Sequence, residues 1–276
     1  MDKLTFVPAG GLANRMRATA AAYTLARRVG VEMTAVWFRD WALNAPFHAL
    51  FEPVRLEGMT LREASLMDYV LLSRPRPKNL RLPRLLQRIM FRDALYEHMI
   101  TPLRKQHFDF EAWARGGGVY LASYTGFLPY DLGLLRRLFV PLPEVERRIA
   151  AFTQRFSPHT IGVHIRRTDN VASIEQSPTS LFTEAIDREL SANADTTVFL
   201  ATDSQEVKGE MRSRYGDRVL TATEEADRDS IEGIRGGIVD MYTLSRTGKI
   251  YGSYQSSFSE LASQIGGVPL EILQKG

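Results

Sequence analysis

The second half of the chain alternates short apolar runs with amphipathic segments, and this alternation limits the possible folds more than any other feature. The apolar runs predict strands at residues 160–166, 197–202, 218–222, 249–254 and 268–273. Helical periodicity predicts helices near 178–190, 204–215, 231–247 and 257–265, after a helix that Pro143 opens. Parallel strands need a crossover long enough to hold a helix, so the alternation predicts a doubly wound α/β sheet.

The start of the chain carries the same signal on a smaller scale. An apolar run at 4–8 leads into Gly10 and Gly11, an alanine-rich helical segment at 14–29 and a second apolar run at 31–37. This strand–helix–strand order predicts a second parallel sheet. Prolines and glycines cluster near 130–145, so we predict an N-terminal domain at 1–140 and a C-terminal domain at 141–276.

The middle of the chain is basic. Residues 83–99 predict one amphipathic helix with arginines on one side and Leu85, Leu86 and Ile89 on another. Residues 74–105 carry nine Lys or Arg against two acidic residues, although the whole chain has a net charge of only +3. Two interpretations stay open: a solvated helix face, or a peripheral contact with an anionic membrane or a lipid-linked glycan acceptor.

Composition excludes several classes of protein. The chain has 276 residues and no cysteine, so disulfides and thiolate catalysis are excluded. It lacks the phosphate loop GxxxxGK[ST], the hydrolase motif GxSxG and a zinc motif such as HExxH. It has no apolar run long enough to cross a membrane, and its basic segment lacks paired aromatics for stacking on bases. We expect a cytoplasmic protein that binds no nucleic acid.

Polar side chains gather where three predicted strands end. His164, Arg166, Arg167 and Asp169 follow the first strand of the second half, in the run HIRRTD. Asp203 and Ser204 follow the strand at 197–202, and the serines after 249–254 lead into a helix: Ser253, Ser256, Ser257 and Ser259. Because ligands of parallel sheets bind at the carboxyl ends of the strands, we expect these three clusters to lie at one edge.

The chemistry of this edge suits a nucleoside diphosphate. Guanidinium groups offer paired donors to phosphate oxygens, and a helix start offers backbone N–H groups to another. Taken singly, each cluster has a structural explanation as a surface ion pair, a helix cap or a core histidine. It is their convergence on one edge that favours ligand binding.

Four segments together resemble the GDP-fucose-dependent fucosyltransferases, the superfamily that includes the α1,6, α1,2 and protein O-fucosyltransferases. They are GGLANRMRATAAAYTLARR near the start, GVHIRRTD, VFLATDS, and SSFSELA near the end, and they span nearly the whole chain. The resemblance implies a GT-B fold, with two Rossmann-like domains facing a cleft and the GDP-sugar held mainly by the C-terminal one. It also implies an enzyme of glycan biosynthesis.

The resemblance implies roles for residues of the C-terminal domain. Arg166 would stabilise the leaving GDP, His164 and Arg167 would support donor binding, and Asp203 would contact the guanine. Asp169, inside the same motif, would also belong to the donor site.

The same resemblance implies contacts with the donor for five further residues. Ser256 and Ser257 would meet the phosphates, and Asp240 would contact the base or ribose. Asn14 and Arg15 would approach the donor from the acceptor-side N-terminal domain.

The implied reaction is inverting, metal-independent transfer of L-fucose from GDP-fucose to a hydroxyl of a glycan or peptide, without a cofactor. The motif departs from the α1,6 pattern, because Asn170 replaces a lysine and Glu175 falls one place later than the family's glutamate. Glu175 and Asp169 are both candidates for the catalytic base. Two alternatives stay open: a non-catalytic GDP-sugar binding protein, and a glycosyltransferase that uses another nucleotide sugar.

A D-x-D pattern at Asp227 and Asp229 is a further candidate feature. Such a pair holds a divalent metal in GT-A glycosyltransferases. Here it lies in a polar acidic stretch that does not follow an apolar strand, so we expect a solvated loop and no metal site.

Overall fold

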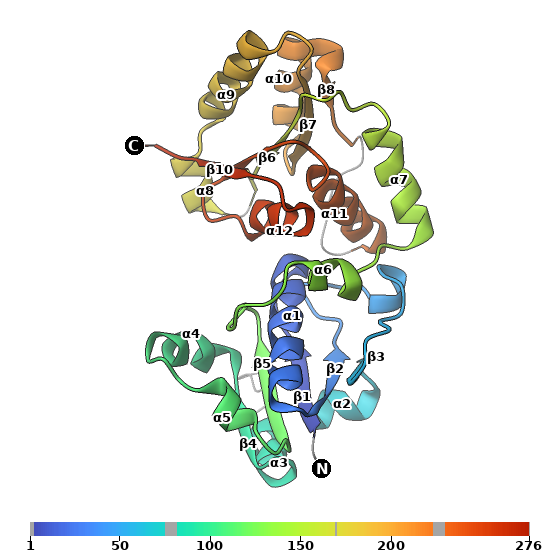
Figure 1. Cartoon of the computed structure of the whole chain (residues 1–276), viewed down its shortest axis with the longest axis vertical. Helices are drawn as coiled ribbons and strands as arrows, with labels where there is room; N and C mark the ends of the chain where they lie inside the picture. The colour runs from blue at the N-terminus through green and yellow to red at the C-terminus, as the bar shows by residue number, and fades with distance from the viewer. Residues whose placement is uncertain (1–2, 75–81, 169, 223–229, 276) are drawn as a thin grey trace. The chain divides into compact units, whose positions relative to one another are not determined.

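The computed structural model of the chain describes residues 3–74, 82–168, 170–222 and 230–275. The chain divides into two compact units, Met1–Val140 and Pro141–Gly276. Each unit contains one five-stranded sheet whose neighbouring strands are parallel, with helices packed against it (Figure 1). The predicted α/β class with two parallel sheets is therefore confirmed.

The sheet of the first unit has the strand order β3-β2-β1-β5-β4. Its strands are β1 (Lys3–Pro8), β2 (Glu32–Trp37), β3 (Met59–Glu63), β4 (Asp93–Leu95) and β5 (Val119–Ser123). The helices are α1 (Leu12–Val29), the short 3-10 helix η1 (Phe47–Ala49), α2 (Leu66–Leu71), α3 (Leu82–Met90), α4 (Glu97–Lys105), α5 (Phe110–Ala114) and α6 (Gly133–Leu138). Helix α1 packs on β1 and β2 and ends at Gly30, whose φ of 71° is the left-handed conformation that glycine adopts readily at a helix end.

The single helix predicted at residues 83–99 is wrong, because a short edge strand interrupts it. The backbone N–H of Phe91 still bonds the Gln87 carbonyl, but that of Arg92 bonds the Gly118 carbonyl at 2.7 Å. From there β4 pairs in register with β5, Asp93 opposite Val119 and Leu95 opposite Leu121. Completing the sheet therefore outweighs the helical spacing of the arginines.

The second unit follows the sequence prediction closely. Its strands are β6 (Thr160–Ile165), β7 (Thr197–Thr202), β8 (Val219–Leu220), β9 (Ile250–Ser253) and β10 (Leu270–Leu273). The helices are α7 (Pro143–Thr153), α8 (Val171–Gln176), α9 (Thr179–Ala192), α10 (Gln205–Tyr215), the short 3-10 helix η3 (Gly216–Arg218), α11 (Ile231–Leu244) and α12 (Ser257–Gly266). Pro143 occupies the start of α7, where its fixed φ and missing N–H cost nothing.

The strand order of the second unit is β10-β9-β6-β7-β8, so its first strand lies at the centre of the sheet. The chain builds outward from β6 through β7 to β8, then returns to the other side through β9 to β10. This is the strand order of a Rossmann-type sheet, and the direction of winding reverses between β6 and β9. Ligands of such sheets bind outside the carboxyl ends of the strands at this reversal point.

Strand β6 is buried along its whole length, as expected for the centre of a parallel sheet covered on both faces. Val163 lies opposite Leu200 of β7 and Tyr251 of β9, and all three belong to one apolar core. The core fixes the register of β6. It thereby determines which residues form the loop after the carboxyl end of β6.

Candidate functional site

The loop that leaves β6 is tied to the end of the neighbouring strand β9 by one serine. The hydroxyl of Ser253 donates to the carbonyl of His164 at 3.1 Å and accepts the backbone N–H of Arg166 at 3.1 Å. Ser253 itself is fully buried. The arginine motif and the serine-rich run therefore meet at the reversal point of the sheet.

The carboxylate of Asp203, at the end of β7, organises the same loop from the other side. One oxygen accepts the backbone N–H of Arg167 at 2.7 Å. The other accepts the hydroxyl of Thr168 at 2.7 Å and its backbone N–H at 3.3 Å. Asp203 thus fixes the backbone between the two strands, as a carboxylate does when it accepts several N–H groups.

The guanidinium of Arg167 turns back into the protein. It donates to the carbonyl of its neighbour Arg166 at 2.8 Å, to the carbonyl of Ser177 at 2.9 Å and to the hydroxyl of Thr179 at 3.0 Å. Burial lowers the pKa of Arg167, although Asp203 opposes the shift. In this structure Arg167 supports the loop, and any effect it has on a ligand is through the position of that loop.

His164 connects β6 to the start of α12. Its Nδ1 lies 3.3 Å from the hydroxyl of Ser256, and its ring stacks on Phe258 at 4.8 Å between ring centres. Burial, helped by the nearby Arg166, lowers the pKa of His164 to about 3. The imidazole is therefore neutral at physiological pH, and its role at this edge is to hold Ser256 and Phe258 in place.

The start of α12 differs from the helices that follow β6 and β7. Asn170 caps α8 by accepting the N–H of Ser173, and Ser204 caps α10 by accepting the N–H of Val207. The corresponding residue of α12 is Ser256, whose side chain makes no such bond because it meets His164 instead. Among the residues that the structure describes, the N-cap side chain of α12 therefore leaves the first-turn N–H groups uncapped at the reversal point, which is the arrangement that suits an anion.

Two backbone features set the position of α12. Gln255, just before it, has a φ of 51°, a strained conformation for a residue with a side chain. Gly252 on β9 lies so close to α12 that an added Cβ would be 2.6 Å from the hydroxyl oxygen of Ser259. The helix start therefore approaches the strand more closely than any larger residue would permit.

Ser177 is an organising residue that the sequence did not single out beyond the start of a helix. It is buried, and its hydroxyl donates to the carbonyl of Leu273 and accepts the backbone N–H of Tyr254 at 2.8 Å. Its carbonyl accepts the guanidinium of Arg167. Nothing in the local pattern Ser-Pro distinguishes such a residue from an ordinary helix start.

The remaining predicted residues of this unit lie on neighbouring elements. Ser257 begins α12 and is half-buried. Glu175 is exposed on α8, the short helix that the sequence analysis did not predict, and Asp240 is buried on α11, which packs on α12. Asp169 lies outside the described residues, as do the two aspartates of the D-x-D pattern.

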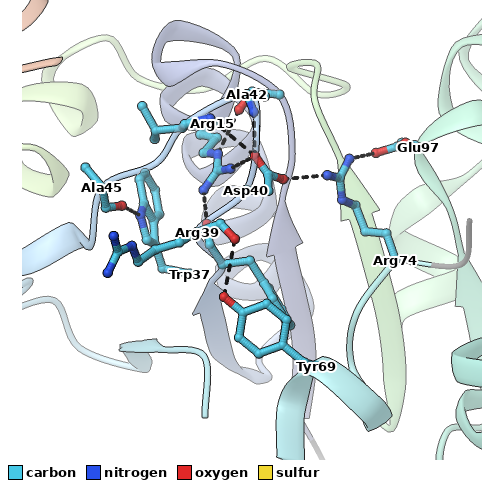
Figure 2. Close-up of polar contacts among 12 residues, drawn as sticks. Arg15, Trp37, Arg39, Asp40, Ala42, Ala45, Tyr69, Arg74 and Glu97 are labelled. Carbon is cyan, nitrogen blue, oxygen red and sulfur yellow. Dashed lines mark hydrogen bonds and ion pairs between the residues drawn. The ribbon is translucent and has the colours of Figure 1, made fainter. Parts of the chain in front are cut away.

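In the first unit, the structure gives Arg15 a different task from the predicted donor contact. Its side chain is fully buried: it donates to the carbonyls of Gly10 and Phe38, pairs with Asp40 at 2.9 Å and lies over the ring of Trp37 (Figure 2). A guanidinium so enclosed has no exposed atom to offer a ligand. The sequence could not distinguish an inward from an outward arginine in the first turns of α1.

Asn14, one residue earlier, is half-buried, and its side-chain oxygen accepts from Arg17 at 3.1 Å. Asp40 also pairs with Arg74 at 2.7 Å, and Arg74 in turn pairs with Glu97 on α4 (Figure 2). Charges of opposite sign thus alternate from α1 across to α4. Within the part of the chain that the structure describes, no three metal-ligating side chains come together, and no helix has the length and apolarity to cross a bilayer.

Solved structures of fucosyltransferases share this fold. NodZ α-1,6-fucosyltransferase, soaked with GDP-fucose, is 21% identical with a TM-score of 0.67 over 97% of this chain and 93% of that chain. A mutant of Arabidopsis thaliana FUT1 in complex with GDP is 15% identical, with a TM-score of 0.60 over 98% of this chain and 70% of that chain. POFUT1 in complex with GDP is 12% identical, with a TM-score of 0.58 over 98% of both chains.

No family model matches the chain, and neither does any curated protein. The structural likeness, at these identities, is a likeness of fold. The family resemblance drawn from the motifs is confirmed at that level.

Proposed function

We propose that the chain is an inverting glycosyltransferase that moves L-fucose from GDP-β-L-fucose to a hydroxyl of a glycan acceptor. The observation that carries this proposal is the start of α12: its N-cap residue Ser256 makes no side-chain cap bond among the described residues, and it lies at the same sheet edge as the β6 loop that bears Arg166. The fold likeness to NodZ, which was soaked with GDP-fucose, and to POFUT1, which was solved with GDP, supports the choice of donor.

In the proposed reaction the bond between fucose and the β-phosphate breaks as the acceptor oxygen attacks the opposite face of the sugar. Negative charge grows on the leaving GDP. Arg166 and the N–H groups at the start of α12, including that of Ser257, would stabilise this charge more strongly in the transition state than in the bound donor. Because these groups supply the positive charge, we propose that no metal ion is needed.

The other residues of the edge would act mainly through position. His164 holds Ser256, while Arg167 and Asp203 hold the β6 loop, through the contacts described above. We also propose that Asp203 accepts an N–H group of the guanine, since each carboxylate oxygen has more than one lone pair. A contact of Asp240 with the base or ribose is the weaker part of this proposal.

A base would remove the proton of the acceptor hydroxyl. Glu175 is the candidate that the structure describes, and its carboxylate is exposed on α8, directly after the β6 loop. Replacing Glu175 by Gln is expected to lower transfer by about 10²–10⁴-fold without weakening GDP binding. If Glu175→Gln transfers fucose at an unchanged rate, Asp169 becomes the candidate for the catalytic base.

We propose that the unit 141–276 binds the donor. We propose that the unit 1–140, which carries Asn14, forms the acceptor side.

The donor class is tested by a thermal-shift panel of GDP, GDP-fucose, GDP-mannose, UDP-glucose and ADP, each with and without EDTA. Selective stabilisation by GDP and GDP-fucose, indifferent to EDTA, would support the donor class and the absence of a metal requirement. Equal stabilisation by UDP-glucose, or loss with EDTA, would contradict it.

Release of GDP from GDP-fucose separates an enzyme from a non-catalytic GDP-sugar binding protein. An enzyme would release GDP in the presence of a pool of glycan acceptors, whereas a binding protein would be stabilised by GDP-fucose and release none. Release from GDP-mannose rather than GDP-fucose would indicate a transferase of another sugar.

A further inference from the structure

Helix α2 in the first unit is turned inside out. Amphipathic helices of globular proteins bury their apolar side, but the buried side chain of α2 is Asp68. Leu66 is 91% exposed, Met67 is 62% exposed, and Tyr69 and Val70 are also exposed. The helix therefore presents Leu66, Met67 and Val70 to the surroundings, while Leu71 packs on the core and the ring of Tyr69 packs on Phe38.

The buried carboxylate of Asp68 is fully engaged. It pairs with both terminal nitrogens of Arg62, at 2.6 and 2.8 Å, and accepts the N–H of Ser65 at 2.7 Å. The Arg62 hydrogen bond is the largest cause that lowers the pKa of Asp68 to about 2. The inverted orientation of α2 is therefore held by a satisfied ion pair, and is not an accident of a loosely packed surface.

Helix α3 repeats the inversion beside it. Its buried side chains are Pro83 and Gln87, and the amide of Gln87 donates to the carbonyls of Leu71 and Ser73, both at 3.0 Å. These bonds attach α3 to the end of α2, and the two helices are in contact. On the outer side of α3, Leu85 is 60% and Ile89 is 77% exposed.

We call the exposed apolar residues of these two helices the outer face; they are Leu66, Met67, Val70, Leu82, Leu85 and Ile89. Single exposed apolar residues are ordinary on any protein surface. A group carried by two adjoining helices, each of which buries a polar side chain, Asp68 on α2 and Gln87 on α3, is typical of a surface that binds an apolar partner.

The charge around the outer face indicates which partner it fits. The described segment 82–92 contains three arginines, Arg84, Arg88 and Arg92, and no acidic residue, and Asp68 of α2 is already paired with Arg62. On α3, Arg88 is exposed and Arg84 lies over the ring of Tyr96. A second copy of this chain would bring the same positive charge, so self-association through this face is disfavoured. An apolar stripe bordered by arginines matches the boundary of a bilayer that contains anionic lipids.

We propose that the outer face of α2 and α3 docks on the surface of an anionic bilayer. The exposed leucines and Ile89 enter the acyl boundary, and Arg84 and Arg88 meet the lipid phosphates. Docking does not depend on sugar transfer, so it can be measured whether or not the proposed function holds. It takes up the membrane interpretation of the basic segment 74–105 and adds an apolar contribution from α2 and α3.

The test is sedimentation of the full chain with vesicles of phosphatidylcholine alone, and with vesicles that also contain phosphatidylglycerol, at low and high salt. Binding is expected only to the anionic vesicles and to weaken with salt. The double substitution Leu85→Ser with Ile89→Ser is expected to weaken it at least about tenfold. Arg88→Gln is expected to weaken it about fivefold.

Two exposed residues elsewhere in the first unit serve as controls: Leu132→Ser removes an exposed apolar side chain, and Arg136→Gln removes an exposed helical arginine. Neither is expected to change vesicle binding, and thermal unfolding would confirm that all variants fold. Absence of binding to anionic vesicles at low salt would overturn the proposal. Unchanged vesicle binding in the Leu85/Ile89 double variant would also overturn it. So would a wild-type chain that does not bind vesicles but self-associates in sedimentation velocity, if the double variant loses that self-association.

Discussion

The two sheets use charge in opposite ways at the carboxyl ends of their strands. In the first unit, the charged residues after β1 and β2 neutralise one another: Asp40 lies between Arg15 at 2.9 Å and Arg74 at 2.7 Å. In the second unit, Asp203 uses its carboxylate to hold backbone N–H groups of the β6 loop, and Ser256, the N-cap residue of α12, makes no side-chain cap bond to the N–H groups of its own helix.

This difference shows that a similar architecture does not determine where a ligand binds. Arg15 is enclosed by the protein, whereas the β6 loop and the start of α12 form the proposed donor site. Both edges carry an arginine close after a strand, Arg15 on α1 and Arg166 in the β6 loop, but the guanidinium of Arg15 is fully buried whereas Arg166 is partly exposed. The comparison therefore predicts that mutations at the first edge change folding and that mutations at the second change ligand binding.

The largest effect is expected at Arg15. Replacing it by Ala removes one of the two arginines that pair with the largely buried Asp40, and breaking a buried ion pair costs about 3–5 kcal/mol. We expect urea unfolding to show this loss. Arg28→Ala, on the same helix, removes an exposed ion pair with Glu111 and should cost less than about 1 kcal/mol. A stable Arg15→Ala protein that fails to bind GDP would break the comparison.

The next effect is expected at Arg166. Replacing it by Ala should lower the rate of GDP release from GDP-fucose by about 10²–10³-fold, because it removes a group proposed to stabilise charge in the transition state. The free energy of unfolding should change little. Arg155→Ala, an exposed arginine of the same unit, is the control. Equal rates for the two variants would show that the guanidinium of Arg166 is not used.

A smaller effect tests the close approach of α12 to β9. Gly252→Ala places a Cβ 2.6 Å from the hydroxyl oxygen of Ser259 and 2.9 Å from its Cβ, so the helix must shift. We expect a loss of about 1–3 kcal/mol in stability and weaker GDP binding. Gly209→Ala, in open space on α10, should instead be neutral or stabilising by up to about 1 kcal/mol. If the affinity for GDP is unchanged in Gly252→Ala, the start of α12 does not contribute to GDP binding.

The smallest effect concerns charge that stabilises the first unit. Arg62 lowers the pKa of Asp68 to about 2, so the folded state binds a proton less readily than the unfolded chain. The stabilisation is therefore present above about pH 4 and lost as the pH falls toward 2. Asp68→Asn should cost about 1–2 kcal/mol at pH 7 in urea unfolding, with the difference from wild type shrinking below pH 4. A difference that does not vary with pH would contradict the ion pair.

The sequence predicted most of the second unit because its signals are local. Strand β7 begins and ends where its apolar run does, and Pro143 and Gly216 mark a helix start and a helix end. The convergence of HIRRTD, Asp203 and the serine run was likewise predictable, because parallel strands bring their carboxyl ends together. Hydrogen bonds of Ser253 and Asp203 join the clusters, and no sequence motif specifies these bonds.

What escaped prediction depends on contacts between distant residues. Strand β4 exists because Asp93–Leu95 finds a partner in β5, and the segment alone reads as helix. The inward direction of Arg15 depends on carbonyls at Gly10 and Phe38. The organising role of Ser177 depends on Leu273, near the other end of the unit. Side-chain direction and long-range pairing are set by the assembled sheet, so local periodicity cannot supply them.

The most direct test of the central claim is a calorimetric titration of the full chain with GDP, GMP and guanosine, repeated for Arg166→Ala and Arg155→Ala. If the β6 loop and the start of α12 hold the diphosphate, wild type and Arg155→Ala should bind GDP at least about tenfold more tightly than GMP, since each charge-assisted hydrogen bond contributes about 1.5–3 kcal/mol. Arg166→Ala should narrow that gap while leaving guanosine binding unchanged. A gap between GDP and GMP that persists in Arg166→Ala, or no preference for GDP in wild type, would contradict the account.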